Sequence, residues 1–167
     1  MRNDLDKLIW EQFYVRIFDE SIPRIKNCLD ILDQNQIWEN PASNLNSIGN
    51  LILHLEGNSR QWILATLFGE KDTRKRLVEF ESKPNFTADD LKRKLDLLET
   101  DLRTKIEGQK VDLSEIYHPQ VFTENGVSIV IHVIEHFSYH TGQIALITKL
   151  RTGQDLKFYG DQNLEIN

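Results

Sequence analysis

The chain lacks the sequence motifs of the commonest enzyme classes, and it has little cysteine and fewer basic than acidic residues. Its single cysteine, Cys28, excludes an intramolecular disulfide and a zinc site built from several cysteines. Glycine-rich nucleotide loops, the G-x-S-x-G elbow and the C-x-x-C pair are all absent, so the usual nucleotide, serine-hydrolase and dithiol signatures are missing. Basic residues are also outnumbered, since 20 Lys+Arg against 26 Asp+Glu give a net charge of -6. We therefore expect neither nucleic acid nor an anionic membrane surface as a partner.

Long apolar runs are lacking as well. A membrane helix needs about 18 consecutive apolar residues, and the strongest run, Val127 to Ile134, is too short. The segment from Met1 to Glu11 is charged and has no apolar stretch typical of a signal peptide, so we expect a cytoplasmic protein. The length of 167 residues favours one domain over residues 1–167. Such a domain buries about 70% of its unfolded surface and needs no covalent staple.

Apolar residues recur at helical spacing in four long segments, which predicts an all-α protein. The predicted helices run from about Asp4 to Leu32, from Ile48 to Phe68, from the capping residue Thr87 to Gly108, and from Gly126 to Leu150. Pro23 should start, bend or interrupt the first of them. Because its apolar residues face most directions, the last helix should be central and largely buried.

The predicted connections contain two further features. Gln34 to Asn46 and Val111 to Asn125 lack helical periodicity and are predicted to be irregular. Lys71 to Asn85 contains Lys71, Arg74, Lys75 and Arg76 close together, which suggests either a phosphate contact or an ordinary solvated loop. The acidic character of the whole chain favours the solvated loop.

The second predicted helix has a polar row beside its apolar stripe. His54, Asn58 and Gln61 follow one another at intervals of four and three residues, so they share one side of the helix. Such a row suits the wall of a cavity, and it equally suits a solvated face.

Three histidines recur on the last predicted helix. His132, His136 and His140 are four residues apart and fall within an arc of about 80°. Imidazoles at this spacing can bind one metal ion in pairs, but the outer two are about 12 Å apart along the axis. At most one adjacent pair can therefore share an ion, and another helix must supply the third ligand. His54 is the natural candidate, because ligands in a helical bundle project inward from facing helices. Three histidines would leave coordination positions open for water or substrate.

The same residues allow another interpretation. His132 to His136 matches H-x-x-E-H, the inverted zinc-protease motif, with Glu135 as general base. Those enzymes need a further glutamate ligand far downstream, and Glu165 in the tail is the sole later glutamate. This interpretation is therefore weaker than the three-histidine site.

Two segments resemble a known family. The stretch from His132 to Ile144, HVIEHFSYHTGQI, looks like the last-helix motif of the DinB/YfiT-like superfamily, and NSIGNLILHLEGNSRQW, from Asn46 to Trp62, looks like its second-helix motif. The chain is similar to a DinB-like bacterial subgroup of unknown function, and the resemblance spans nearly its whole length.

The resemblance implies a four-helix bundle with up-down-down-up topology, a homodimer, and a divalent metal ion bound by three histidines. These would be His54 together with His136 and His140, the two that directly precede Thr-Gly-Gln. His132 lies one turn too early for a ligand. We expect it to pack beside the site or to touch a ligand histidine. Glu135 could orient a ligand histidine or pair with a surface base, and Gln143 could line the cavity or bond a helix end.

Chemistry is implied more loosely. Nitrogen ligands suit zinc or nickel first, and iron or copper are the next candidates. Characterised relatives use low-molecular-weight thiols, which suggests a metal-dependent S-transferase or related hydrolase acting on a small thiol, such as bacillithiol, and an electrophile. The sequence assigns no catalytic residue beyond the ligands. The alternative is a non-catalytic metal-binding or stress-response protein.

Overall fold

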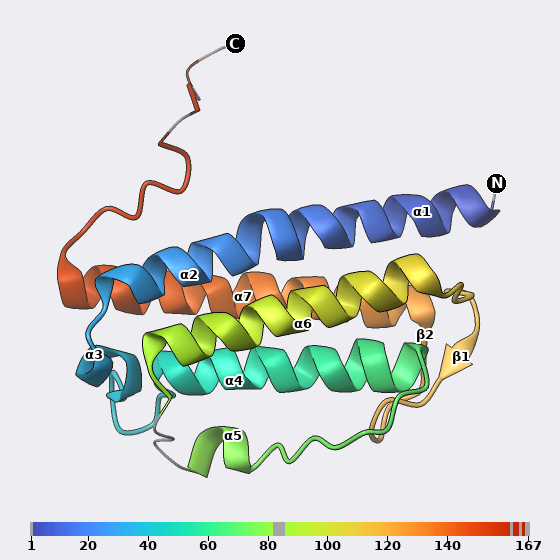
Figure 1. Ribbon diagram of the computed structural model, residues 1–167, viewed down its shortest axis with the longest axis horizontal. Coiled ribbons are helices and arrows are strands. Elements are labelled where there is room, and N and C mark those ends of the chain that lie inside the picture. Colours follow the sequence, from blue (N-terminus) through green and yellow to red (C-terminus); the bar gives the residue numbers. More distant parts are fainter. Residues whose placement is uncertain (1, 82–85, 161, 164, 166–167) are drawn as a thin grey trace.

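The computed structural model describes residues 2–81, 86–160, 162–163 and 165 of the chain (Figure 1). Of its four long helical segments, two are single α-helices and two also contain a π-helical stretch, denoted η. In chain order the elements are α1 (Arg2–Phe13), η1 (Tyr14–Ser21), α2 (Ile22–Ile31), α3 (Gln34–Trp38), α4 (Ile48–Ser59), η2 (Arg60–Leu67), α5 (Val78–Glu81), α6 (Ala88–Gly108), β1 (Ile116–Tyr117), β2 (Glu124–Asn125) and α7 (Gly126–Thr152).

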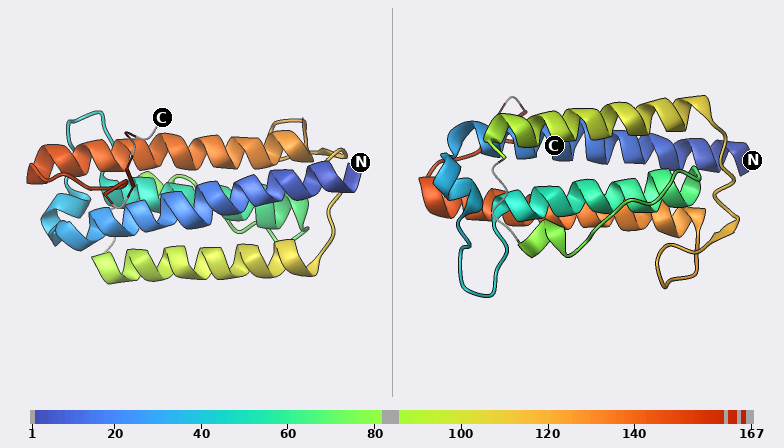
Figure 2. Two further views of the ribbon diagram at one scale, coloured as in Figure 1. Left: turned by 90° about the horizontal axis from the view of Figure 1, so that it is seen from above. Right: turned by 60° about the horizontal axis from the view of Figure 1, so that its bottom comes forward.

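The long segments form a four-helix bundle, as predicted. The α1–η1–α2 segment and α7 run in one direction, whereas α4–η2 and α6 run in the other (Figures 1 and 2). The order along the chain is therefore up-down-down-up. The two short strands pair in antiparallel fashion just before α7, within the connection predicted to be irregular.

Pro23 disturbs the first helix without breaking it. The π-helical stretch η1 ends at Ser21, two residues before Pro23, and the backbone N–H of Ile22 donates to the carbonyl of Ile17, five residues earlier. Proline has no N–H of its own, and its ring crowds the carbonyl four residues before it. The wider π turn relieves this crowding, so the helix runs on from α1 into α2.

The predicted helix starts at Ser47 and Thr87 are confirmed. The hydroxyl of Ser47 accepts from the amide of Asn50, and Thr87 forms a capping box with Asp90. The prediction of an irregular segment from Gln34 to Asn46 is wrong in part, because α3 begins there. Asp33 and Gln36 form a second capping box, and this D-x-x-Q pattern was the local signal for it.

The last helix lies against most of the bundle but keeps one exposed side. It contacts α1, η1, α2, α4 and η2, and its inward side chains, Phe137 among them, are completely buried. Its outer side leaves Ile131, Leu146 and Leu150 exposed, so the expectation of burial in most directions is too strong. The pairing of α7 with α4 positions the candidate site. No helix among the described residues is long and apolar enough to cross a membrane.

Candidate metal centre

His54, His136 and His140 converge between α4 and α7. Each offers a ring nitrogen, and these three nitrogens all lie within 4.8 Å of one another. The ring centroid of His54 is 4.8 Å from that of His136 and 5.3 Å from that of His140. His54 is 7% exposed, so the polar row on α4 faces the interior and is not a solvated surface. Nitrogens this close can share one ion after small side-chain rotations.

Hydrogen bonds at the outer nitrogens orient two of the rings. Nδ1 of His54 is 2.8 Å from Oε2 of Glu79, and an ionised carboxylate can only accept, so Nδ1 carries the proton. Nδ1 of His140 likewise lies 2.7 Å from Oε1 of Gln143, an amide oxygen that also only accepts. In both rings the lone pair is therefore on Nε2. Such bonds fix the tautomer and the direction of metal-binding histidines in general.

His136 has the environment most typical of a metal-binding histidine. Its Nε2 is buried and has no hydrogen-bond partner among the described residues. Burial, together with the neighbouring His140 and His54, lowers the pKa of His136 to about 3, so the ring is neutral at physiological pH. Burial also lowers the pKa of His140, although its bond to Gln143 opposes the shift. A buried, neutral, unpartnered imidazole is costly on its own and fits a metal ligand.

A buried ion pair supports His54 from behind. Arg74 donates from Nε to Oε1 of Glu79 at 2.7 Å and from Nη2 to Oε2 at 2.9 Å, in the bidentate manner of arginine and carboxylate. Nη1 of Arg74 donates to Oε1 of Gln61 at 2.9 Å. Nη2 also lies 3.1 Å from Nδ1 of His54, because both nitrogens donate to Oε2 of Glu79. Burial would raise the pKa of the Glu79 carboxyl, but the bonds from Arg74 and His54 outweigh it and lower that pKa. Glu79 is therefore an ionised acceptor for His54.

Sequence reasoning missed this pair. Arg74 belongs to the segment predicted to be a solvated basic loop, yet its side chain is only 4% exposed. Glu79 lies in the one-turn helix α5 of the same segment, whose last predicted residues, 82–85, are outside the described part of the chain. Gly57 makes the packing possible, because a Cβ there would lie 2.2 Å from Oε1 of Glu79. That glycine was the local signal of close approach.

The remaining candidates lie around the cluster. His132 stacks on Trp62 with ring centroids 3.9 Å apart and contacts Nδ2 of Asn58, in keeping with a residue that packs beside the site. Gln143 touches His140 as described. Glu135 is exposed on another side of α7, and among the described residues no hydrogen bond joins it to a histidine. His118 is exposed in the segment before β2 and takes no part.

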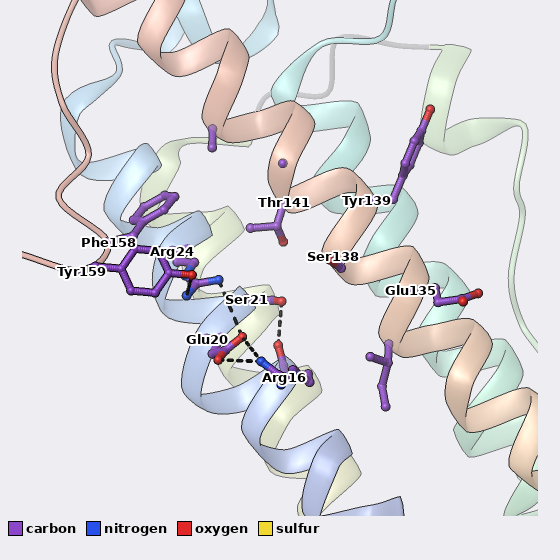
Figure 3. A pocket seen from close by; sticks show the side chains of 13 residues that line it. Arg16, Glu20, Ser21, Arg24, Glu135, Ser138, Tyr139, Thr141, Phe158 and Tyr159 are labelled. Carbon is purple, nitrogen blue, oxygen red and sulfur yellow. Dashed lines mark hydrogen bonds and ion pairs between the residues drawn. The ribbon is translucent and has the colours of Figure 1, made fainter. Parts of the chain in front are cut away.

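Two hollows border α7, and they differ in chemistry. A pocket of about 400 Å³ has His140 and Gln143 in its wall and so reaches the histidine cluster. A larger groove of about 890 Å³ lies between η1–α2 and α7 and is lined by Glu135 (Figure 3). No histidine lines that groove, and its Glu20 is paired with arginines, at 3.0 Å from Arg16 and 3.6 Å from Arg24. The smaller pocket is the relevant one for the site.

The role of Glu79 can be tested directly. Glu79→Ala should weaken divalent metal binding by about 10- to 100-fold, the usual cost of removing a residue that orients a ligand histidine. Glu79→Gln should lose less, since an amide oxygen can still accept from Nδ1 of His54. Glu135→Ala, on the exposed side of α7, is the matched control. Calorimetric titration with Zn²⁺ gives the affinities, and equal affinities for the Glu79→Ala and Glu135→Ala proteins would contradict the assignment.

Fold and site together define a class, an all-α four-helix bundle of up-down-down-up order with a three-histidine cluster. Within it, this chain belongs to the family described as protein of unknown function (DUF1572), which matches residues 11–160. The bundle is also similar to the crystal structure of a DinB-like protein from Bacillus cereus ATCC 10987. The TM-score is 0.65 at 15% identity, over 86% of this chain and 93% of the other. No curated protein matches the chain significantly.

Proposed function

We propose that the protein binds one divalent metal ion through Nε2 of His54, His136 and His140. The observation that carries the proposal is the buried Nε2 of His136, which has no partner among the described residues and lies beside two histidines already oriented by Glu79 and Gln143. Neutral nitrogen ligands suit zinc or nickel first and iron or copper next. Three ligands leave positions open for water or substrate, as in reactive rather than structural sites.

We further propose that the site is catalytic. A bound divalent ion would lower the pKa of a water or a small thiol and stabilise the resulting nucleophile. The chain itself would contribute orientation: Glu79 and Gln143 hold the ligand rings, and Arg74 keeps Glu79 ionised. The pocket beside His140 offers about 400 Å³ for a substrate. These features suit an S-transferase or a related hydrolase that acts on a small thiol and an electrophile. By resemblance to the superfamily we also propose a homodimer.

A non-catalytic metal-binding or stress-response protein is the second candidate. The site is consistent with this candidate, since each residue described in it either binds the ion or orients a ligand, and none is placed as a catalytic acid or base. Turnover separates the two: the metal-loaded protein is incubated with an electrophile such as chlorodinitrobenzene and, in turn, with bacillithiol, glutathione and the uncharged 1-propanethiol. Product formation above that of the metal-free protein supports the enzyme, and its absence with a full complement of metal supports the binder.

Metal binding itself is tested on the unaltered protein. The chain is stripped with a chelator, dialysed, and titrated with Zn²⁺ and Ni²⁺ while bound metal is measured by elemental analysis. We expect one ion per chain and a rise in melting temperature, because a ligand that binds only the folded state stabilises it. A protein that takes up no ion, or takes it up with no change in melting temperature, would refute the proposal.

A further inference from the structure

The pocket beside His140 has an uncharged wall. Its residues come from α4, from the loop that precedes α4 and from α7: Leu51, Asn44, Leu45, Asn46, Tyr139, His140, Gln143, Leu146 and Ile147. Not one of these is Asp, Glu, Lys or Arg, although these four types make up 28% of the chain. The polar groups of the wall are amides, a phenol and an imidazole, so it can form hydrogen bonds but cannot neutralise a charge.

The charged groups nearest the histidines are already occupied. Arg74 donates from Nε and Nη2 to Glu79 and from Nη1 to Gln61. Nε2 of Gln61 in turn donates to Asp72 at 2.7 Å. This network lies behind His54, and none of its members lines the pocket beside His140. A charged substituent of a ligand would therefore meet no ionic partner here.

The size and the lining of the pocket restrict its occupant. A volume of about 400 Å³ is at the lower end of the range for small-molecule sites. Leu51, Leu146 and Ile147 provide apolar contact, which favours burial of a hydrocarbon group. An ionised group in the same position would give up water without compensation.

From these observations we infer that the pocket accepts uncharged small molecules with an apolar tail, whose polar head lies at His140. This inference rests on the proposed metal site, because the head would reach the ion held there. It names the substrate class that this particular chain selects: neutral, apolar thiols or electrophiles rather than anionic ones.

Two thiols of similar length test the inference by binding alone. The Co²⁺-loaded protein is titrated with 1-propanethiol and with 3-mercaptopropionate, and the visible absorption of cobalt reports coordination of sulfur. Both ligands present the same primary thiol to the metal, so a difference in affinity comes from the other end of the molecule, a methyl group in one and a carboxylate in the other. We expect the dissociation constant of 3-mercaptopropionate to be about tenfold higher, a typical effect of an uncompensated charge. An equal or lower dissociation constant for 3-mercaptopropionate overturns the inference.

A charge placed in the wall should change this preference. Leu146 is 59% exposed and lines the pocket, so Leu146→Lys should fold normally and should tighten binding of 3-mercaptopropionate relative to 1-propanethiol. Leu150→Lys is the matched control, since Leu150 lies one turn further along α7, is 75% exposed and is not among the pocket residues. Equal effects of the two variants would overturn the inference. Failure to bind Co²⁺ at all would instead refute the proposed metal site.

Discussion

Replacing His136 with alanine is expected to abolish binding of the divalent ion. The variant loses the ligand itself, so its affinity should fall by more than the roughly 10- to 100-fold expected for removal of a residue that only orients a ligand. The reason lies in the site: Nε2 of His136 is buried without a hydrogen-bond partner in the described part of the chain, and the nitrogens of His54 and His140 converge with it within 4.8 Å. Two histidines alone hold an ion weakly. Calorimetry and elemental analysis of the dialysed protein measure the loss.

Two histidine variants serve as controls for this result. His118→Ala removes an exposed histidine far along the chain from the cluster and should bind metal like the unaltered protein. His132→Ala removes the ring stacked on Trp62, next to the cluster, and should reduce affinity much less than His136→Ala. Circular dichroism verifies that all three variants fold. If His136→Ala retained one tightly bound ion while His132→Ala lost it, the ligand assignment would be wrong.

Phe137→Ala should destabilise the fold by about 3–5 kcal/mol, the usual cost of truncating a buried phenylalanine. Phe137 directly follows His136 but is completely buried in the core, because neighbouring residues on a helix point about 100° apart. A loss of this size is a large part of the stability of a typical domain, which is about 5–15 kcal/mol. Urea denaturation of the metal-free protein measures it.

An exposed aromatic residue on the same helix provides the comparison. Tyr139 is 64% exposed, so Tyr139→Ala should change the free energy of unfolding by no more than about 0.5 kcal/mol. A change below about 1 kcal/mol for Phe137→Ala would show that the core does not pack as described.

Helical periodicity was sufficient to predict the four long helices, since each has apolar residues at helical spacing over many turns. Their arrangement as an up-down-down-up bundle was implied by the resemblance to the DinB/YfiT-like superfamily. Caps at Ser47 and Thr87 located two helix starts, because capping is a local interaction. The sequence could predict that the histidines of α4 and α7 lie close together, because their spacing places them on one face of each helix and such faces point toward the interior of a bundle. The capping box at Asp33 is equally local, and α3 was missed because its helix is only 5 residues long.

The ion pair that orients His54 could not be predicted from the sequence, for a different reason. Arg74 and Glu79 reach the site from a connection that lacks periodicity, so nothing in its sequence indicates which side chains turn inward. The carboxylate that contacts a cluster histidine is Glu79, whereas proximity in sequence had suggested Glu135. Glu135 is adjacent to His136 along the chain but lies about 100° away around the helix, where it is one of the residues that line the groove of Figure 3.

The division of the three histidines between α4 and α7 has a consequence for unfolding. An ion held by His54 and by the pair on α7 would act as a cross-link between segments that lie far apart in the sequence, with the whole of α6 in the loop that it closes. Closing a long loop removes conformational freedom from the open chain, so such a link favours the folded bundle more than a link between near neighbours would. Metal supply would then govern how long the protein survives proteolysis, and the chain would be cleared fastest when its ion is scarce.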